Sequence, residues 1–190
     1  MLTSCMEDDF VNLFLRFFIV YLTARSRPRL HALDESLLTF RVWLNDLDIN
    51  AHMNNGRYLT LMDLGNLDIM LRTGLFKFLF KHKWQPIMAS VIIRYKHALR
   101  PFQKYQLRTR LLCWDEKWFF AEQRFERDGE VVAISMAKGL FRGPAGNVSP
   151  AEVFKVLGYH VDSPPVPESV AIWQQSEALL LDKVQVGSRV

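Results

Sequence analysis

The stretch Asp46-Leu47-Asp48-Ile49-Asn50-Ala51-His52-Met53-Asn54-Asn55-Gly56-Arg57-Tyr58 separates two strongly patterned segments of this 190-residue chain. Before it, residues 38–44 alternate in polarity and are rich in β-formers, which predicts a strand. After it, residues 56–72 are apolar almost all round, and an asparagine at 54 or 55 can cap them, which predicts a buried helix. The quoted stretch is therefore expected to be a loop that leads into the first turn of that helix.

The remaining pattern indicates one antiparallel sheet. Asp128-Gly129 is a strong signal for a tight hairpin between the last two of four predicted strands. Those strands are residues 87–99, 105–114, 118–127 and 131–142, and short helices are predicted at 75–82, 151–157 and 170–181. A single sheet must cover its apolar face, and only one long apolar helix is available, so the sheet should wrap around it. The fold class is α+β.

The quoted loop resembles the DxDxxxHxNNxxY signature of the 4-hydroxybenzoyl-CoA thioesterase-like and plant acyl-ACP thioesterase-like families. It is most similar to the thioesterase-superfamily-member-6-like proteins, which share the DLD…HMNNxRY wording and an apolar N-terminal stretch. The resemblance implies a hotdog fold, in which a curved antiparallel sheet wraps around one long central helix, with extra N- and C-terminal helices. It also implies hydrolysis of acyl-CoA or acyl-ACP thioesters. The expected units are an apolar helix and basic linker (1–34), a hotdog thioesterase-like domain (35–160) and a C-terminal connector and helix (161–190).

The residues themselves fit that chemistry. Thioester hydrolysis needs a base or nucleophile and a donor to the carbonyl oxygen. Asp48 supplies a carboxylate just before the predicted helix. The first N–H groups of that helix, near Asn55 and Gly56, lack helix partners and carry the positive end of its dipole, so both residues are expected to bind substrate. No metal or cofactor is required.

The resemblance extends to individual side chains. In the resembling families the aspartate at the position of Asp48 activates water or attacks the carbonyl directly. By the same resemblance, Asn50 would orient substrate or water, and His52 would tune the site or position the loop. From the residues alone, Asp48 also fits an Asx-turn and His52 a hydrogen-bonding scaffold. Asn54 is expected to cap the helix. Tyr58 is expected to pack under the loop, next to the substrate.

Asp63 is the second catalytic candidate. It falls within the predicted buried helix, where an unpaired carboxylate is costly, and in some hotdog enzymes a helix carboxylate is the catalytic one. Thr60, or pairing across a dimer interface, offers an alternative, purely structural explanation. Asp46 is expected to face solvent or to cap the loop, with no role. A metal-dependent hydrolase using Asp46, Asp48 and His52 is disfavoured, because no second ligand cluster has a recognisable spacing.

The N-terminal segment allows two interpretations. Residues 10–22 are apolar except for Asn12 and Arg16, but they are too few for a membrane span of about 20 residues. The acidic residues 7–9 argue against a signal peptide. One interpretation is a helix packed on the domain, with Arg16 reaching solvent. The other is attachment to a membrane surface, with the arginines at 25, 27 and 29 facing anionic headgroups.

The composition of the chain indicates which kinds of partner and which cellular location to expect. A net charge of +4 without a nucleic-acid motif favours small anionic ligands or an anionic membrane surface over nucleic acid. Cys5 and Cys113 form no disulfide framework or metal motif, which predicts a reducing, cytoplasmic location, with membrane association through residues 10–22. Arg94, Lys96 and Arg100 share a strand face, which is either solvated or meets CoA phosphates.

The predicted assembly is a homodimer or a dimer of dimers. The hotdog sheet keeps one edge strand, and a single chain leaves its acyl channel incomplete, so the sites are expected at the subunit interface. The alternative function is a non-catalytic protein that binds acyl thioesters or lipids at a membrane surface. Acyl length, and the choice between CoA and acyl carrier protein, depend on side-chain packing that the sequence does not fix.

Overall fold

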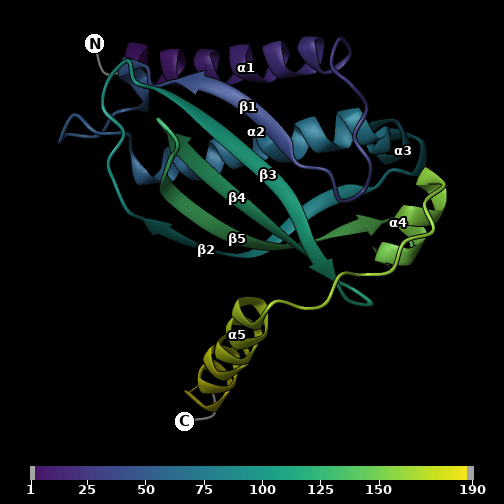
Figure 1. The fold of residues 1–190 in the computed structure, drawn as a ribbon. Helices are drawn as coiled ribbons and strands as arrows, with labels where there is room; N and C mark the ends of the chain where they lie inside the picture. Colours follow the sequence, from purple (N-terminus) through teal and green to yellow (C-terminus); the bar gives the residue numbers. More distant parts are fainter. Residues whose placement is uncertain (1–2, 188–190) are drawn as a thin grey trace.

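The computed structural model describes residues 3–187, and the side chains of residues 13–180 (Figure 1). Its centre is one antiparallel sheet in the order β1-β3-β4-β5-β2, with β6 paired to β5, curled around helix α2. The strands are β1 (Ser36–Arg41), β2 (Gln85–Tyr95), β3 (Lys104–Trp114), β4 (Phe119–Arg127), β5 (Glu130–Gly143) and β6 (Gly146–Val148). The helices are α1 (Thr3–Ala24), α2 (Asn55–Thr73), α3 (Leu75–His82), α4 (Pro150–Leu157) and α5 (Glu168–Gly187), with a 3₁₀ turn η1 (Leu44–Asp46). This is the expected hotdog arrangement.

Local signals set the ends of α2. The Asn54 side chain accepts the Gly56 N–H at 2.8 Å and caps the helix start, as predicted. Gly74 ends the helix at φ 83°, a left-handed conformation that glycine adopts without strain. Between them, Gly65 lets the helix approach β3 closely, because a Cβ at this position would lie 2.2 Å from Thr109 Oγ1. The helix is therefore fixed both along its axis and against the sheet.

The predicted elements occur in the predicted order, with shifted ends. Asp128 and Gly129 form the expected hairpin turn, with φ values of 54° and 83°. Strand β2 ends at Tyr95, four residues before the predicted end at 99, because the chain turns away and the Lys96 and His97 N–H groups both donate to Val132 O. The three-residue elements η1 and β6 carry too little pattern to be predicted.

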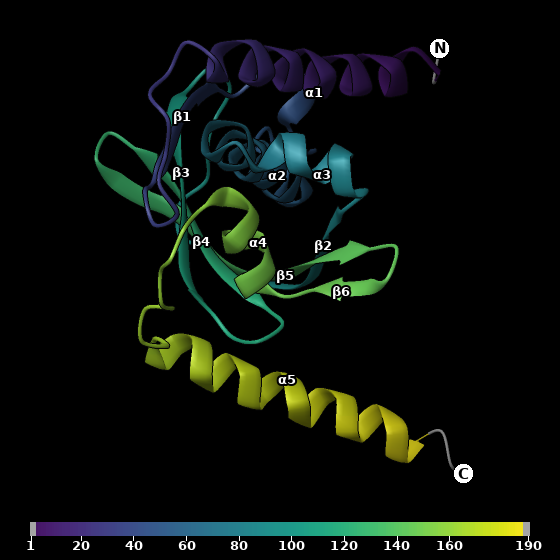
Figure 2. The same ribbon diagram turned by 90° about the vertical axis from the view of Figure 1, so that its right-hand side faces the viewer.

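Helix α1 packs on the domain through one side only (Figure 2). Val20, at 2% exposure, belongs to the main core. Arg16 is also buried, at 7% exposure, so the expectation that it reaches solvent is wrong. The opposite side is exposed and apolar, with Phe14, Leu15, Phe17, Phe18, Ile19 and Leu22 open to solvent. No helix in the described part of the chain is long and apolar enough to cross a bilayer.

Helix α5 lies against the outer face of the sheet and then leaves it (Figures 1 and 2). Val170 and Trp173 pack on Phe120 and Cys113, and the Lys138 ammonium on β5 pairs with Glu177 at 2.7 Å. Cys113 is a buried free thiol. Cys5 lies outside the residues whose side chains are described.

Candidate active site

Asp48 organises its own loop. Its carboxylate Oδ1 accepts the N–H groups of Asn50 at 2.8 Å and His52 at 3.3 Å, and its N–H donates to His52 O at 2.8 Å. This is an Asx-turn, so the loop-stabilising role is present in the structure. Partial desolvation raises the pKa of Asp48, but these N–H groups, the Asn50 side chain and the nearby His52 outweigh it and hold the pKa below its usual value. Asp48 therefore stays a carboxylate at neutral pH.

The first backbone N–H groups of α2 differ in whether they have a hydrogen-bond partner among the described residues. The Gly56 N–H is taken by the Asn54 cap, so the expectation of a bare amide at Gly56 is wrong. The Arg57 N–H is also used, because it donates to Asn54 O at 2.9 Å. Asn55 is exposed, and no hydrogen bond from its N–H is found among the described residues. Tyr95, at the end of the edge strand β2, donates its hydroxyl to Asn55 O at 3.0 Å, a contact that sequence reasoning missed.

Asp46 does not face solvent; it is buried, with 1% exposure. Arg16 from α1 forms a two-pronged ion pair with its carboxylate, at 2.5 and 3.2 Å, and Arg57 approaches Oδ1 at 3.4 Å. The same carboxylate accepts the Trp43 N–H at 2.9 Å, which bears out the expected capping role. The backbone oxygen of Asp46 also accepts the Asn54 N–H at 2.8 Å. Asp46 therefore joins α1, the loop and the start of α2.

Tyr58 supports the helix start from beneath. Its side chain is 2% exposed, and its ring contacts Tyr95 and Phe125 at centroid distances of 5.0 and 4.8 Å. Burial raises the pKa of Tyr58 to about 12, against the lowering effect of a hydrogen bond to the Leu99 backbone. Tyr58 thus packs under the loop, as expected, and in this single chain its side chain has almost no surface left for a substrate.

Asp63 is an exposed residue of α2, so the helix is not buried all round. The Thr60 hydroxyl donates to Arg57 O at 3.0 Å, so the suggested pairing of Thr60 with Asp63 is wrong. No hydrogen bond or ion pair to Asp63 occurs within the described residues. Its surroundings are largely apolar, and this desolvation raises the pKa of the Asp63 carboxyl.

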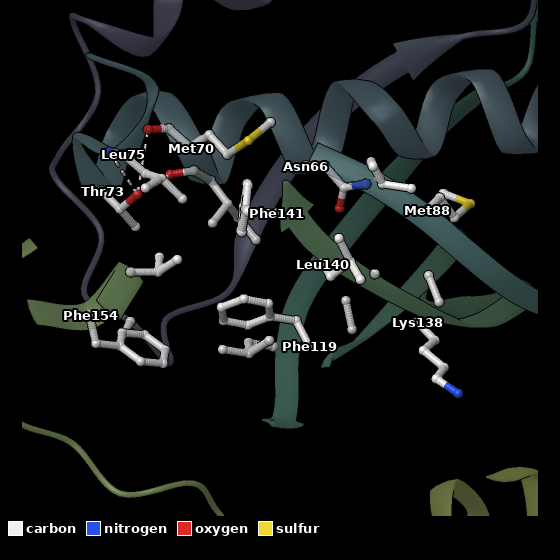
Figure 3. A pocket seen from close by; sticks show the side chains of 18 of the residues that line it. Asn66, Met70, Thr73, Leu75, Met88, Phe119, Lys138, Leu140, Phe141 and Phe154 are labelled. Atoms are coloured by element: carbon white, nitrogen blue, oxygen red, sulfur yellow. Dashed lines mark hydrogen bonds between the residues drawn. The ribbon is translucent and has the colours of Figure 1, made fainter. Parts of the chain in front are cut away.

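An apolar cavity of about 210 Å³ lies between α2, the inner face of the sheet and α4 (Figure 3). Asp63 and Asn66, three residues apart on α2, are among its few polar lining residues. Asn66 Oδ1 accepts a hydrogen bond from Gln123 Nε2 at 3.1 Å, while the Gln123 Oε1 atom is buried without a partner in the described structure. The apolar walls include Met70, Ile87, Met88, Leu111, Phe119, Leu140, Phe141 and Phe154.

The candidate residues thus fall into two groups. Asp48, Asn50, His52, Asn55 and Gly56 share the loop and the helix start. Asp63 lies eight residues further along α2 than Asn55, about 12 Å at 1.5 Å per residue. Asp63 lines two of the four main cavities found in the described chain, and Asp48 lines none of them. Within that part of the chain, no three His, Cys, Asp or Glu side chains are grouped as a metal site would require.

Sequence comparison identifies the family. The sequence profile of the thioesterase-like superfamily matches residues 42–174, which include the loop, α2 and the whole sheet except β1. The chain belongs to this superfamily. Protein THEM6 of Xenopus laevis is 37% identical over 163 residues, covering 84% of this chain and 77% of the relative. Protein THEM6 of Drosophila melanogaster is 27% identical and covers 94% of this chain and 89% of its own length.

Solved structures share the fold. A probable thioesterase from Escherichia coli is 18% identical, with a TM-score of 0.59 over 64% of this chain and 95% of that one. A 4-hydroxybenzoyl CoA thioesterase mutant, solved with 4-hydroxybenzoyl CoA, is 13% identical, with a TM-score of 0.59 over 65% of this chain and 98% of that one. At these identities the likeness establishes the hotdog fold alone.

Proposed function

We propose that the protein hydrolyses acyl-CoA or acyl-ACP thioesters to a carboxylic acid and a free thiol. The observation that carries the proposal is the apolar cavity under α2, whose polar lining includes Asp63, a carboxylate with no hydrogen bond or ion pair among the described residues, beside Asn66. Its 210 Å³ exceeds the roughly 150 Å³ of a protein cavity that holds benzene, so it has room for one aromatic ring or a short or medium acyl chain. The superfamily, and relatives named as thioesterases such as a probable one in Saccharomyces cerevisiae, support the same reaction.

In this proposal Asp48 is the base or nucleophile, and the head of α2 polarises the thioester carbonyl. The Asn55 N–H is the available donor at the positive end of the helix dipole. Asn50 and His52 fix the Asp48 carboxylate through their backbone N–H groups. A thiolate leaves readily near neutral pH, because a thiol pKa is about 8.5, so no strong general acid is needed.

Asp63 is the second candidate for the base, and its place in the cavity wall favours it. A carboxylate with a raised pKa is a better base for a water molecule at neutral pH than one with a lowered pKa. Asp48 has the support of the family signature, and Asp63 that of the cavity. The two assignments predict different variants to be inactive.

A homodimer, or a dimer of two such dimers, would complete the site. Strand β2 is an edge of the sheet, and all 11 of its residues are exposed or half-exposed, including Ile92 at 43%. A long open edge favours pairing with a second copy. Tyr95 on this strand contacts the head of α2, so a partner on β2 would lie beside the Asp48 loop. Sedimentation should give a dimer or tetramer at micromolar concentration, whereas a monomer would contradict this assembly.

The decisive experiment compares matched isosteric variants. Wild type, Asp48→Asn and Asp63→Asn are assayed with acyl-CoAs of increasing length and with benzoyl-CoA, with released thiol as the readout. We expect saturable turnover in the wild type and a loss of at least about a hundredfold in kcat for Asp48→Asn, the lower end of general-base contributions. Full turnover in Asp48→Asn with loss in Asp63→Asn would transfer the catalytic role to Asp63.

The second candidate function is a non-catalytic acyl-thioester or lipid-binding protein on a cytoplasmic membrane surface. The exposed apolar side of α1 favours it, because a broad apolar helix face otherwise costs solubility. Phe18→Glu with Leu22→Glu alters this face and leaves the packed side of α1 intact. Binding would be favoured over hydrolysis by two results together. The wild type would bind acyl-CoA without turnover above background, and it would be recovered with membranes while the double variant would not.

A further inference from the structure

A groove of about 740 Å³ lies in the surface where the ends of α1, α2 and α4 meet α3. None of its lining residues is acidic, and its lining includes the cations Arg25, Arg27, Arg29, Arg72, Lys77 and Lys155. The net charge of the whole chain is only +4, so positive charge is concentrated here. We propose that this basic groove binds the phosphate headgroups of anionic lipids at a membrane surface.

The cations divide into two that are paired with a carboxylate and four that are exposed. Arg27 and Arg72 are both committed to the buried Asp68 carboxylate, at 2.6 and 3.2 Å. Arg25, Arg29, Lys77 and Lys155 are exposed, and none of them forms an ion pair with another described residue. Arg25 and Arg29 lie in the linker after α1, Lys77 lies in α3 and Lys155 lies in α4, so folding alone brings them together. A phosphate in the groove would therefore meet available charges rather than compete with carboxylates.

The wall that carries Arg29 is held in place. Arg72 Nε donates to Pro28 O at 2.8 Å, and the Leu30 N–H donates to Arg72 O at 3.2 Å. From the other side, the Tyr159 hydroxyl donates to Leu30 O at 3.2 Å. Asp34, the acidic residue nearest in sequence, accepts the His31 N–H at 2.7 Å. The linker is thus anchored at both walls, and the groove is preformed.

The surroundings favour a lipid over a soluble phosphate. A smaller depression joins Arg25 and Lys77 of the basic groove to Tyr21 and Phe80. Phe80 is 72% exposed, and Leu22 on the adjoining side of α1 is 50% exposed. Exposed apolar side chains beside exposed cations match a bilayer boundary, where rings enter the acyl region and cations meet headgroups. The inference is independent of thioester hydrolysis and adds a headgroup site to the membrane attachment proposed for α1.

Vesicle flotation of the full chain tests this assignment. The vesicles are phosphatidylcholine alone, or phosphatidylcholine with one-fifth phosphatidic acid. Arg29→Glu with Lys155→Glu lowers the net charge from +4 to 0 (two changes of −2). Lys104→Glu with Lys117→Glu makes the same change at exposed positions far from the groove in sequence. The loss of the two cations alone should weaken binding to the anionic vesicles by about 25-fold, at about fivefold per cation, and the control pair should weaken it much less.

Each outcome decides the matter. The proposal holds if the groove variant loses the anionic-lipid preference while the control variant and the acyl-CoA turnover are unchanged. Equal losses in both variants would mean a general charge effect and overturn it. Equal wild-type binding to both kinds of vesicle would also overturn it, leaving attachment to the apolar side of α1 alone. If millimolar free CoA displaces the wild-type protein from the vesicles but has no effect on the groove variant, this result would assign the groove to a soluble nucleotide phosphate instead.

Discussion

Replacing Arg16 by methionine tests whether α1 is an integral part of the folded unit. The substitution keeps the length of the side chain but removes both hydrogen bonds to Asp46 and leaves a carboxylate with 1% exposure. Removing one partner of a buried ion pair costs about 3–5 kcal/mol. Asp46 would keep Arg57 at 3.4 Å and the Trp43 N–H at 2.9 Å, so we expect the lower end, about 3 kcal/mol.

Urea unfolding followed by circular dichroism measures this loss. With an m-value of about 2 kcal/mol per molar, a loss of 3 kcal/mol moves the midpoint down by about 1.5 M. Arg25→Met is the matched control, because Arg25 is exposed and its side chain interacts with the Tyr21 hydroxyl and ring rather than with a buried carboxylate, so its midpoint should move by less than about 0.3 M. Asp46→Asn should lower the free energy of unfolding by less in the Arg16→Met variant than in the wild type. An Arg16→Met midpoint within about 0.3 M of the wild type would refute the role of this ion pair.

Three further predictions concern the site and the core. If Asp48 is the base, kcat/KM should stay constant as the pH is lowered to about 4, the usual aspartate range. The reason is that the base must be ionised and hydrogen bonds lower the pKa of Asp48. A fall in kcat/KM that begins at a higher pH would point to Asp63, whose pKa is raised. Gly65→Ala should lower the free energy of unfolding by about 1–3 kcal/mol, since its Cβ would meet Thr109 Oγ1 at 2.2 Å, and Thr109→Ala should restore part of it in urea titrations. Ala121→Leu fills the cavity and should reduce kcat/KM about tenfold or more for the longer acyl-CoAs, with acetyl-CoA little affected; equal loss on all chain lengths would place the acyl group elsewhere.

Local features of the fold could be predicted because each depends on a few neighbouring residues. The Asn54 cap, the Asp128-Gly129 hairpin and the Gly74 helix end all follow from backbone preferences within one turn. The wrapped sheet follows from one apolar helix and several strands that must cover each other.

Contacts between distant segments could not be predicted in this way. Arg16 and Asp46 are 30 residues apart, and nothing near either residue specifies the other as partner. The sequence also does not say which side of α2 the sheet covers, so Asp63 was expected inside the helix packing and instead lies in the cavity wall. The expectation of a bare N–H at Gly56 was wrong for a different reason: the Asn54 cap, which was itself predicted, already uses this donor.

Thioester hydrolysis itself is tested most directly by released thiol from an acyl-CoA series, with the double variant Asp48→Asn/Asp63→Asn as the inactive reference. The account predicts saturable wild-type turnover on at least one short, medium or aromatic acyl-CoA, and background rates for the double variant with its fold intact. Thioester hydrolysis would be contradicted if the wild type unfolds cooperatively but its rates equal those of the double variant on every substrate.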